Sequence, residues 1–324
     1  MRLLIDTNVW MYLAESVRPS ALRDEARRHK VTIVAAPAVL YEVLRMPETQ
    51  RVVRDQALAM IAADWWSRPM PEAYDESMEL LGEVRRLRPM WLSQNPVLEQ
   101  FNQLRADWST SSRGTWWRAR YQADKMAVWI GGVDDPLLKR GEQDYKIARS
   151  LFREQKVQQL PPDAGSMTNL APGTPRHGIE TWRTHSEFVA RGAFARRSTY
   201  LDWLSPWLDV SAVGSSLHSW ERFWYHDVQA ANMPRWWLRE TMRLHQSTRK
   251  VNAGSPVDNQ IASYVFGSDG LLTADKTFAQ LVNVVGQVAP RPAARAYVVP
   301  AGPSCFPAVV ELLEGLRRGK ATNT

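Results

Sequence analysis

The chain has 324 residues, of which 44% are hydrophobic, so it can bury a sizeable core and global disorder is excluded. The single cysteine, Cys305, excludes an intramolecular disulfide and makes a cysteine-ligated zinc site implausible. The net charge of +7 suggests an anionic partner such as nucleic acid, and the lack of a membrane-length apolar run or signal-peptide pattern predicts a cytoplasmic protein with no membrane contact.

The first part of the chain alternates short apolar runs with helical patterns. Residues 2–5 predict a buried strand, and the β-branched run 31–37 predicts a second strand that ends at Pro37. Residues 67–71 predict either a short third strand or a turn. Helices are predicted at 20–30, at 38–46, from there to about Trp65, and at 72–88.

The chain then changes in character. Of its 15 Trp residues, 12 lie between Trp91 and Trp237, in a segment whose pattern is mostly helical. A stretch with loop composition, 161–178, interrupts this segment. We therefore predict a discontinuous core at 1–88 and 236–324, and a Trp-rich helical insertion at 89–235.

Alternation of strands and helices resumes towards the C-terminus. Helices are predicted at 236–250, 255–267 and 307–319. Residues 270–278 read as a strand, a polar turn and a helix start, and 295–300 as a last strand. Strands that alternate with helices at both ends of the chain favour an α/β fold with a parallel sheet.

Acidic residues accompany these predicted strands. Asp6 and Asp275 each follow a strand, and Glu42 and Asp258 lie on helices next to strands. Because the carboxyl ends of parallel strands share one edge of the sheet, we expect the four carboxylates to converge there. Converging carboxylates repel one another unless a cation lies among them, and oxygen ligands favour Mg²⁺ or Mn²⁺. Such a site suits phosphodiester hydrolysis by a metal-activated water.

Four segments that contain these acids resemble, in order, the motifs of PIN-domain nucleases, and the toxin-type members of bacterial toxin–antitoxin pairs look most similar. The segments are LLIDTNVW, APAVLYEV, SPVDNQIASY and GLLTADKTF. The resemblance implies a three-layer α/β/α core and a metal-dependent endoribonuclease. It assigns catalysis and metal binding to Asp6, Glu42, Asp258 and Asp275, with Asn8 and Thr273 as supporting polar groups.

Other interpretations remain open at this point. Asp6 and Asp275 could simply cap helices, Glu42 could face solvent, and Asp258 could stabilise a helix N-terminus. The whole protein could be a catalytically idle PIN module that binds RNA or protein through the insertion, or a nuclease directed at DNA. An antitoxin or a second copy of the chain could be a further partner.

Two stretches interleave Trp with Arg, a mixture that can stack on bases and contact phosphates. They are RGTWWRAR at 113–120 and the start of the basic helix predicted after residue 234. The alternative is that Trp at helical spacing belongs to a core or a protein interface. From the second stretch and its continuation we predict nucleic-acid contacts by Arg235, Trp236, Arg239, Arg243, Arg249 and Lys250.

Overall fold

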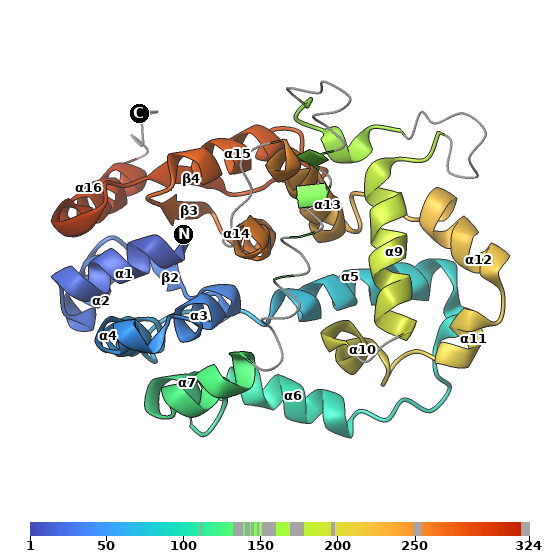
Figure 1. Ribbon diagram of the computed structural model, residues 1–324, viewed down its shortest axis with the longest axis horizontal. Coiled ribbons are helices and arrows are strands. Elements are labelled where there is room, and N and C mark those ends of the chain that lie inside the picture. The colour runs from blue at the N-terminus through green and yellow to red at the C-terminus, as the bar shows by residue number, and fades with distance from the viewer. Residues whose placement is uncertain are drawn as a thin grey trace.

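The computed structural model describes residues 1–110, 112–131, 160–168, 178–195, 198–248 and 255–318, with single residues between 139 and 150. The described residues form an α/β fold with a four-stranded parallel sheet in the order β2-β1-β3-β4 (Figure 1). The strands are β1 (Arg2–Ile5), β2 (Thr32–Val34), β3 (Gly270–Thr273) and β4 (Arg295–Val298). The predicted α/β class and parallel sheet are therefore confirmed.

The sheet is built from short apolar runs. Leu3 pairs with Ile33 on one side of β1, and Leu4 pairs with Leu271 on the other side. Leu3, Leu4 and Ile5 are fully buried, as expected for parallel strands that are covered on both faces. Because all pairings are parallel, the carboxyl ends of the strands lie along one edge, which we call the carboxyl edge.

Residues 67–71 contribute one bridge to this sheet and not a strand. Ser67 pairs in parallel with Val34, and its backbone nitrogen donates to the Ile33 carbonyl at 2.8 Å. Pro69 and Pro71 follow closely, and proline has no N–H group with which to continue a ladder. The third strand therefore stops after one residue.

Helices lie on both sides of the sheet (Figure 1). One group comprises α1 (Thr7–Ser16), α2 (Pro19–Arg28), α4 (Arg51–Ile61) and α16 (Cys305–Arg317). The other comprises α13 (Pro234–Ser247), α14 (Ser255–Ala262) and α15 (Lys276–Gly286). Helix α3 (Pro37–Leu44) contacts both α4 and α14, so it connects the two groups.

Several helices differ slightly from their predicted limits. Helix α4 ends at Ile61 and not near Trp65, and a 3-10 turn, η1 (Glu48–Gln50), precedes it. The helix predicted at 255–267 changes after Ala262 into the 3-10 helix η5 (Ser263–Gly267). A further 3-10 turn, η6 (Gly302–Ser304), precedes α16.

The segment predicted as an insertion is mainly helical where it is described. Together with α5 (Glu72–Leu87), which leads into it, the part of this segment after residue 178 forms the right-hand side of Figure 1, and the part at 99–121 runs along its lower side. Its elements are η2 (Pro89–Trp91), α6 (Glu99–Ser109), α7 (Thr115–Tyr121), helical residues 123–131, η3 (Ala164–Ser166), α9 (Thr181–Ala195), α10 (Thr199–Leu204), α11 (Val210–Gly214), α12 (Leu217–Arg222) and the π-helical turn η4 (Phe223–Asp227).

Aromatic side chains hold this segment together and connect it to α13. Successive ring centroids of Trp91, Phe223, Trp224 and Trp236 are 5.2, 5.4 and 5.5 Å apart. The buried apolar residues of the sheet region and of the helical segment belong to one large cluster. The two predicted domains therefore share an apolar interior.

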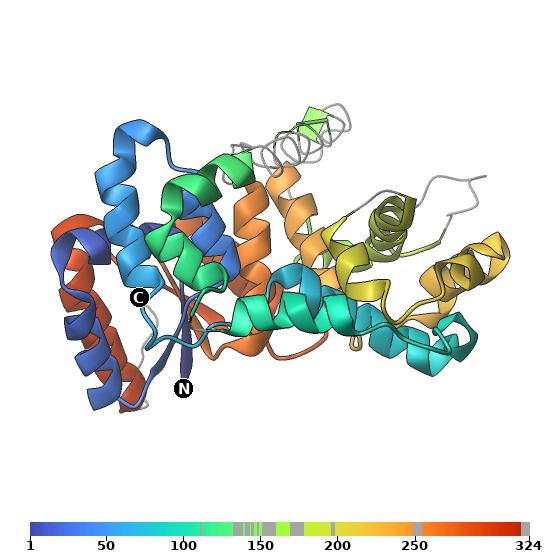
Figure 2. The same ribbon diagram turned by 90° about the horizontal axis from the view of Figure 1, so that it is seen from below.

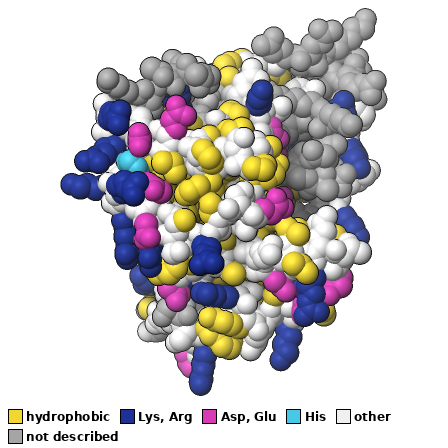
Figure 3. Space-filling view, turned by 90° about the vertical axis from the view of Figure 1, so that its left-hand side faces the viewer, with side chains coloured by type: hydrophobic (Ala, Val, Ile, Leu, Met, Phe, Trp, Pro, Cys, Tyr) yellow, Lys and Arg dark blue, Asp and Glu magenta, His cyan; other side chains and the backbone are white. Residues whose placement is uncertain are grey.

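The surface at the sheet end of the molecule carries mixed charge. Seen from the left of Figure 1, apolar side chains gather near the middle of this face, and Lys and Arg are interspersed with Asp and Glu (Figure 3). This agrees with the first 88 residues, in which 13 basic and 13 acidic residues cancel. None of the described helices combines the length and apolar character needed to cross a membrane.

Candidate carboxylate site

Asp6 is fixed at the carboxyl end of β1. It is buried, with 4% of its surface exposed, and its carboxylate accepts two hydrogen bonds. The backbone nitrogen of Thr7 donates to one oxygen at 2.7 Å, and Thr273 Oγ1 donates to the other at 2.6 Å. The first of these bonds caps α1, so Asp6 is a helix cap and also a member of the carboxyl edge.

Asn8 and Thr273 tie the ends of β1 and β3 together. Asn8 Oδ1 accepts from the Ala274 backbone nitrogen at 2.9 Å, and Thr273 Oγ1 accepts from the Asp275 nitrogen at 3.0 Å while it donates to Asp6. Thr273 is fully buried. Both residues predicted as supporting groups are thus placed where they orient the acids and the backbone around them.

Asp275 is exposed and caps α15. Its Oδ1 accepts from the backbone nitrogens of Thr277 at 2.7 Å and Phe278 at 2.9 Å. Asp275 therefore caps α15, as Asp6 caps α1. The cap also holds its carboxylate in a fixed position at the carboxyl edge.

Glu42 reaches the same edge from α3. Its carboxylate accepts a hydrogen bond of 2.5 Å from Thr7 Oγ1, which connects α3 to the start of α1. Burial raises the pKa of Glu42, and the Thr7 bond and the nearby Arg45 act in the opposite direction. The hydroxyl of Thr7, which directly follows Asp6 in the sequence, is therefore a further polar group at this edge.

The four carboxylates lie close enough to affect one another. Burial raises the pKa of Asp258 to about 8, and repulsion from Asp6, Glu42 and Asp275 contributes to the rise. Burial also raises the pKa of Asp6 to about 6; the Thr273 hydrogen bond lowers it, and repulsion from Glu42 and Asp275 raises it. Within the described ranges, no Lys or Arg forms an ion pair with Asp6, Asp258 or Asp275.

The donor atoms at this edge are all oxygens, which suits a hard divalent cation. In the part of the chain that the structure describes, however, no three His, Cys, Asp or Glu side chains are gathered tightly enough to hold a metal ion. The carboxylates therefore interact through space without forming a closed ligand cage.

The structure corrects the prediction that α13 presents a nucleic-acid surface. Trp236 is 1% exposed, and its Nε1 donates to the Glu76 carbonyl at 2.9 Å, so its ring is not accessible for stacking. The three arginines pair with acids at 2.6 to 2.7 Å, in the pairs Arg235–Glu79, Arg239–Glu76 and Arg243–Glu240. Arg249 and Lys250 lie outside the described residues.

The reason for this correction is the complementary pattern of α5 and α13. Both patterns are visible in the sequence, but only the packing shows that the two helices meet. Acids recur on α5 as Glu72, Asp75, Glu76, Glu79 and Glu83. Arg235 and Arg239 of α13 pair with acids of this set, whereas Arg243 pairs with Glu240 of its own helix.

No protein-family model, curated protein or solved structure matches this chain.

Proposed function

We propose that the protein is a metal-dependent endoribonuclease of the PIN type. The observation that carries the proposal is the shared electrostatic environment of Asp6, Glu42, Asp258 and Asp275 at the carboxyl edge. Asp6 and Asp258, whose pKa values neighbouring acids help to raise, are stabilised in their ionised forms when an external cation binds among them. Ligands of parallel sheets commonly bind at this edge.

Mg²⁺ or Mn²⁺ suits the all-oxygen donor set. Asp6, Glu42, Asp258 and Asp275 would hold it only after moving closer together than they lie in this structure. When bound, such an ion lowers the pKa of a water molecule and compensates charge on the phosphate. RNA is the proposed substrate because the toxin-type PIN resemblance of the four segments implies it.

The chain's own contribution is orientation. Asp6 is held through both oxygens, by the Thr7 nitrogen and the Thr273 hydroxyl, so its position does not depend on a bound ligand. Glu42 is held by the Thr7 hydroxyl. Because the pKa of Asp258 is about 8, this group carries a proton at neutral pH until a cation favours its ionised form.

The first experiment measures cleavage. The purified protein is incubated with a single-stranded RNA, with total RNA and with plasmid DNA, each in Mg²⁺, in Mn²⁺ and in EDTA. We expect RNA cleavage that depends on the divalent ion. Cleavage in EDTA would contradict the proposed dependence on a metal ion. Cleavage of plasmid DNA without cleavage of RNA would contradict RNA as the substrate.

The matched variants are Asp6→Asn and Asp24→Asn. Asn caps a helix nearly as well as Asp, so Asp6→Asn should preserve α1 while it removes one charge from the site. We expect cleavage to fall at least about a hundredfold. Asp24 lies on the surface of α2 with its side chain 59% exposed, and its variant should cleave normally. Activity of Asp6→Asn within a few-fold of the wild type would overturn the assignment of the site.

A further inference from the structure

The two Trp residues of the RGTWWRAR stretch have different surroundings. Trp116 is fully buried, its ring centroid lies 6.2 Å from that of Trp108, and the Arg68 guanidinium lies 5.2 Å from its ring. Trp117 is only partly buried, and its ring lies 5.3 Å from Tyr121, which is 61% exposed. The first Trp therefore anchors α7 to the protein, while the second contributes to its surface.

Aromatic and basic side chains continue along the helical residues that follow. Lys125 is exposed, and Trp129, one turn further on, is 57% exposed. The Arg120 guanidinium lies 5.3 Å from the Tyr121 ring. We call Trp117, Arg120, Tyr121, Lys125 and Trp129 the aromatic–basic surface. In the described part of the chain, neither Arg120 nor Lys125 forms an ion pair.

This surface is anchored beside the helix that carries Glu42. Tyr41, the neighbour of Glu42, packs edge-on against Trp108 with ring centroids 5.7 Å apart, and Trp108 contacts Trp116. Figure 2 shows α7 next to α3 and α4, and α7 also contacts α4. Three residues of the chain therefore lead, through ring contacts, from the carboxylate site to the aromatic–basic surface.

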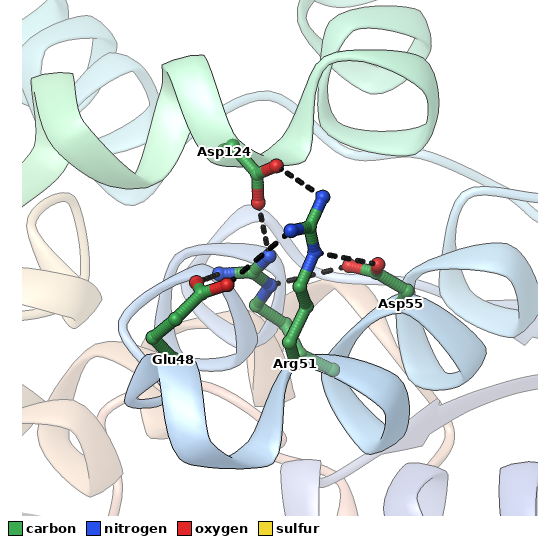
Figure 4. Close-up of polar contacts among 5 residues, drawn as sticks. Glu48, Arg51, Asp55 and Asp124 are labelled. Atoms are coloured by element: carbon green, nitrogen blue, oxygen red, sulfur yellow. Dashed lines mark hydrogen bonds and ion pairs between the residues drawn. The ribbon is translucent and has the colours of Figure 1, made fainter.

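An ion-pair cluster holds the same segment at its other end. Asp124 accepts from Arg51 at 2.6 Å and also from Arg54, whose side chain is 2% exposed (Figure 4). Both arginines lie on α4. The one acid among the exposed residues 120–129 is thus neutralised by two arginines, so the charge left on the surface is positive.

We propose that the aromatic–basic surface binds single-stranded nucleic acid and so guides the strand that the carboxylate site cleaves. The inference rests on the proposed nuclease function. Exposed rings offer platforms for unpaired bases, and nearby cations contact phosphates, which is how proteins bind single strands without reading their sequence. A duplex keeps its bases stacked internally, so the surface selects single strands over double strands.

The test uses the full chain with Asp6→Asn, so that the probe is not cut. Binding of a fluorescently labelled, unstructured RNA of about 20 nucleotides is measured by anisotropy in EDTA, and again with the same RNA annealed to its complement. We expect tighter binding of the single strand. Adding Trp129→Ala or Tyr121→Ala should weaken that binding at least about fivefold, and Lys125→Ala should reduce its salt dependence.

Phe188→Ala is the matched control. Phe188 is an aromatic residue of α9 that is 63% exposed, and its loss should leave binding unchanged. Equal binding of the single strand by all variants, no binding by the parent protein, or equal loss in Phe188→Ala would overturn the inference. The cleavage assay with the wild-type chain separates the two proposals. If the protein cleaves RNA but Trp129→Ala does not weaken RNA binding, only the proposed binding surface is wrong. If the protein binds the single strand but does not cleave it, only the proposed nuclease function is wrong.

Discussion

Two sets of acids in this protein have different partners. Between α5 and α13, Glu76 is fully buried and pairs with Arg239 at 2.7 Å, and Glu79 pairs with Arg235 at the same distance. At the carboxyl edge, Asp6 is almost as buried, yet its partners are a hydroxyl and a backbone nitrogen. Among the described residues, the helical interface pairs its acids with arginines, whereas no Lys or Arg forms an ion pair with Asp6, Asp258 or Asp275.

The electrostatics follow the same division. Burial raises the pKa of Glu79 to about 7, and Arg235 lowers it both through its charge and through hydrogen bonds. For Asp258, burial and three neighbouring acids all act to raise the pKa, which reaches about 8. Glu76 also contributes to the rise at Glu79, so the two sites differ in the arginine that opposes the rise and not in the presence of repulsion between acids.

The largest expected effect concerns the paired acids. Glu76→Ala leaves the partly buried Arg239 without its main partner and also removes the buried acceptor of the Tyr200 hydroxyl. We expect the free energy of unfolding to fall by about 3 to 5 kcal/mol, measured by urea denaturation. Glu48→Ala is the control: its side chain is 68% exposed, and we expect a change within about 0.5 kcal/mol. Similar losses of stability in the two variants would show that Glu76 contributes no more to the fold than an exposed acid.

The raised pKa of Asp258 predicts that the stability of the fold depends on pH. The pKa of Asp258 is raised from 3.8 to about 8 in the folded chain, so between these values the unfolded chain has released a proton that the folded chain still holds. In EDTA the wild type should therefore lose stability as pH rises across this window. Relative to Asp258→Asn, we expect a loss of about 1 to 2 kcal/mol between roughly pH 5.5 and 7.5.

Thermal denaturation at several pH values measures this difference, and Mg²⁺ should reduce it because a bound cation favours the ionised carboxylates. Parallel pH profiles of the wild type and Asp258→Asn would show that the edge carboxylates do not repel one another in solution.

A smaller effect, on metal binding, is expected from loss of the Thr7 hydroxyl, which donates a hydrogen bond to Glu42. Thr7→Val keeps the shape of the side chain but removes the hydrogen bond to Glu42, whereas Thr7→Ser keeps the hydroxyl. We expect Thr7→Val to weaken Mn²⁺ binding about tenfold, or about 1.4 kcal/mol, in a calorimetric titration. Thr7→Ser should bind within about twofold of the wild type. Equal Mn²⁺ affinities of the two variants would show that the Thr7 hydroxyl does not contribute to the site.

The smallest effect is expected for an ion pair in solvent. Arg51 and Asp124 are paired at 2.6 Å, but their side chains are 53% and 50% exposed (Figure 4). Arg51→Ala should therefore lower the unfolding free energy by less than about 1 kcal/mol. Arg54→Ala should cost more, because the Arg54 side chain is only 2% exposed while it pairs with Asp55 and Asp124. A larger loss of unfolding free energy for Arg51→Ala than for Arg54→Ala would show that burial does not determine the strength of these ion pairs.

The sequence alone determined the sheet and the place of its acids. The apolar runs of β1 and β3 end at Asp6 and at Thr273, and the parallel arrangement follows from the alternation of strands with helices. These are local signals: a short apolar run, a polar residue at its end and a helical period can each be read within ten residues.

Only the tertiary structure decided how the helices use their charged and aromatic faces. Trp116 and Trp117 are adjacent and identical in type, yet one is buried against Trp108 and the other lies partly at the surface. Arg239 is of a residue type that often binds phosphate, yet it pairs with the buried Glu76, which lies 163 positions away. A side chain's own helix fixes the face on which it lies, but its partner depends on which distant helix packs there, and that pairing leaves no local pattern.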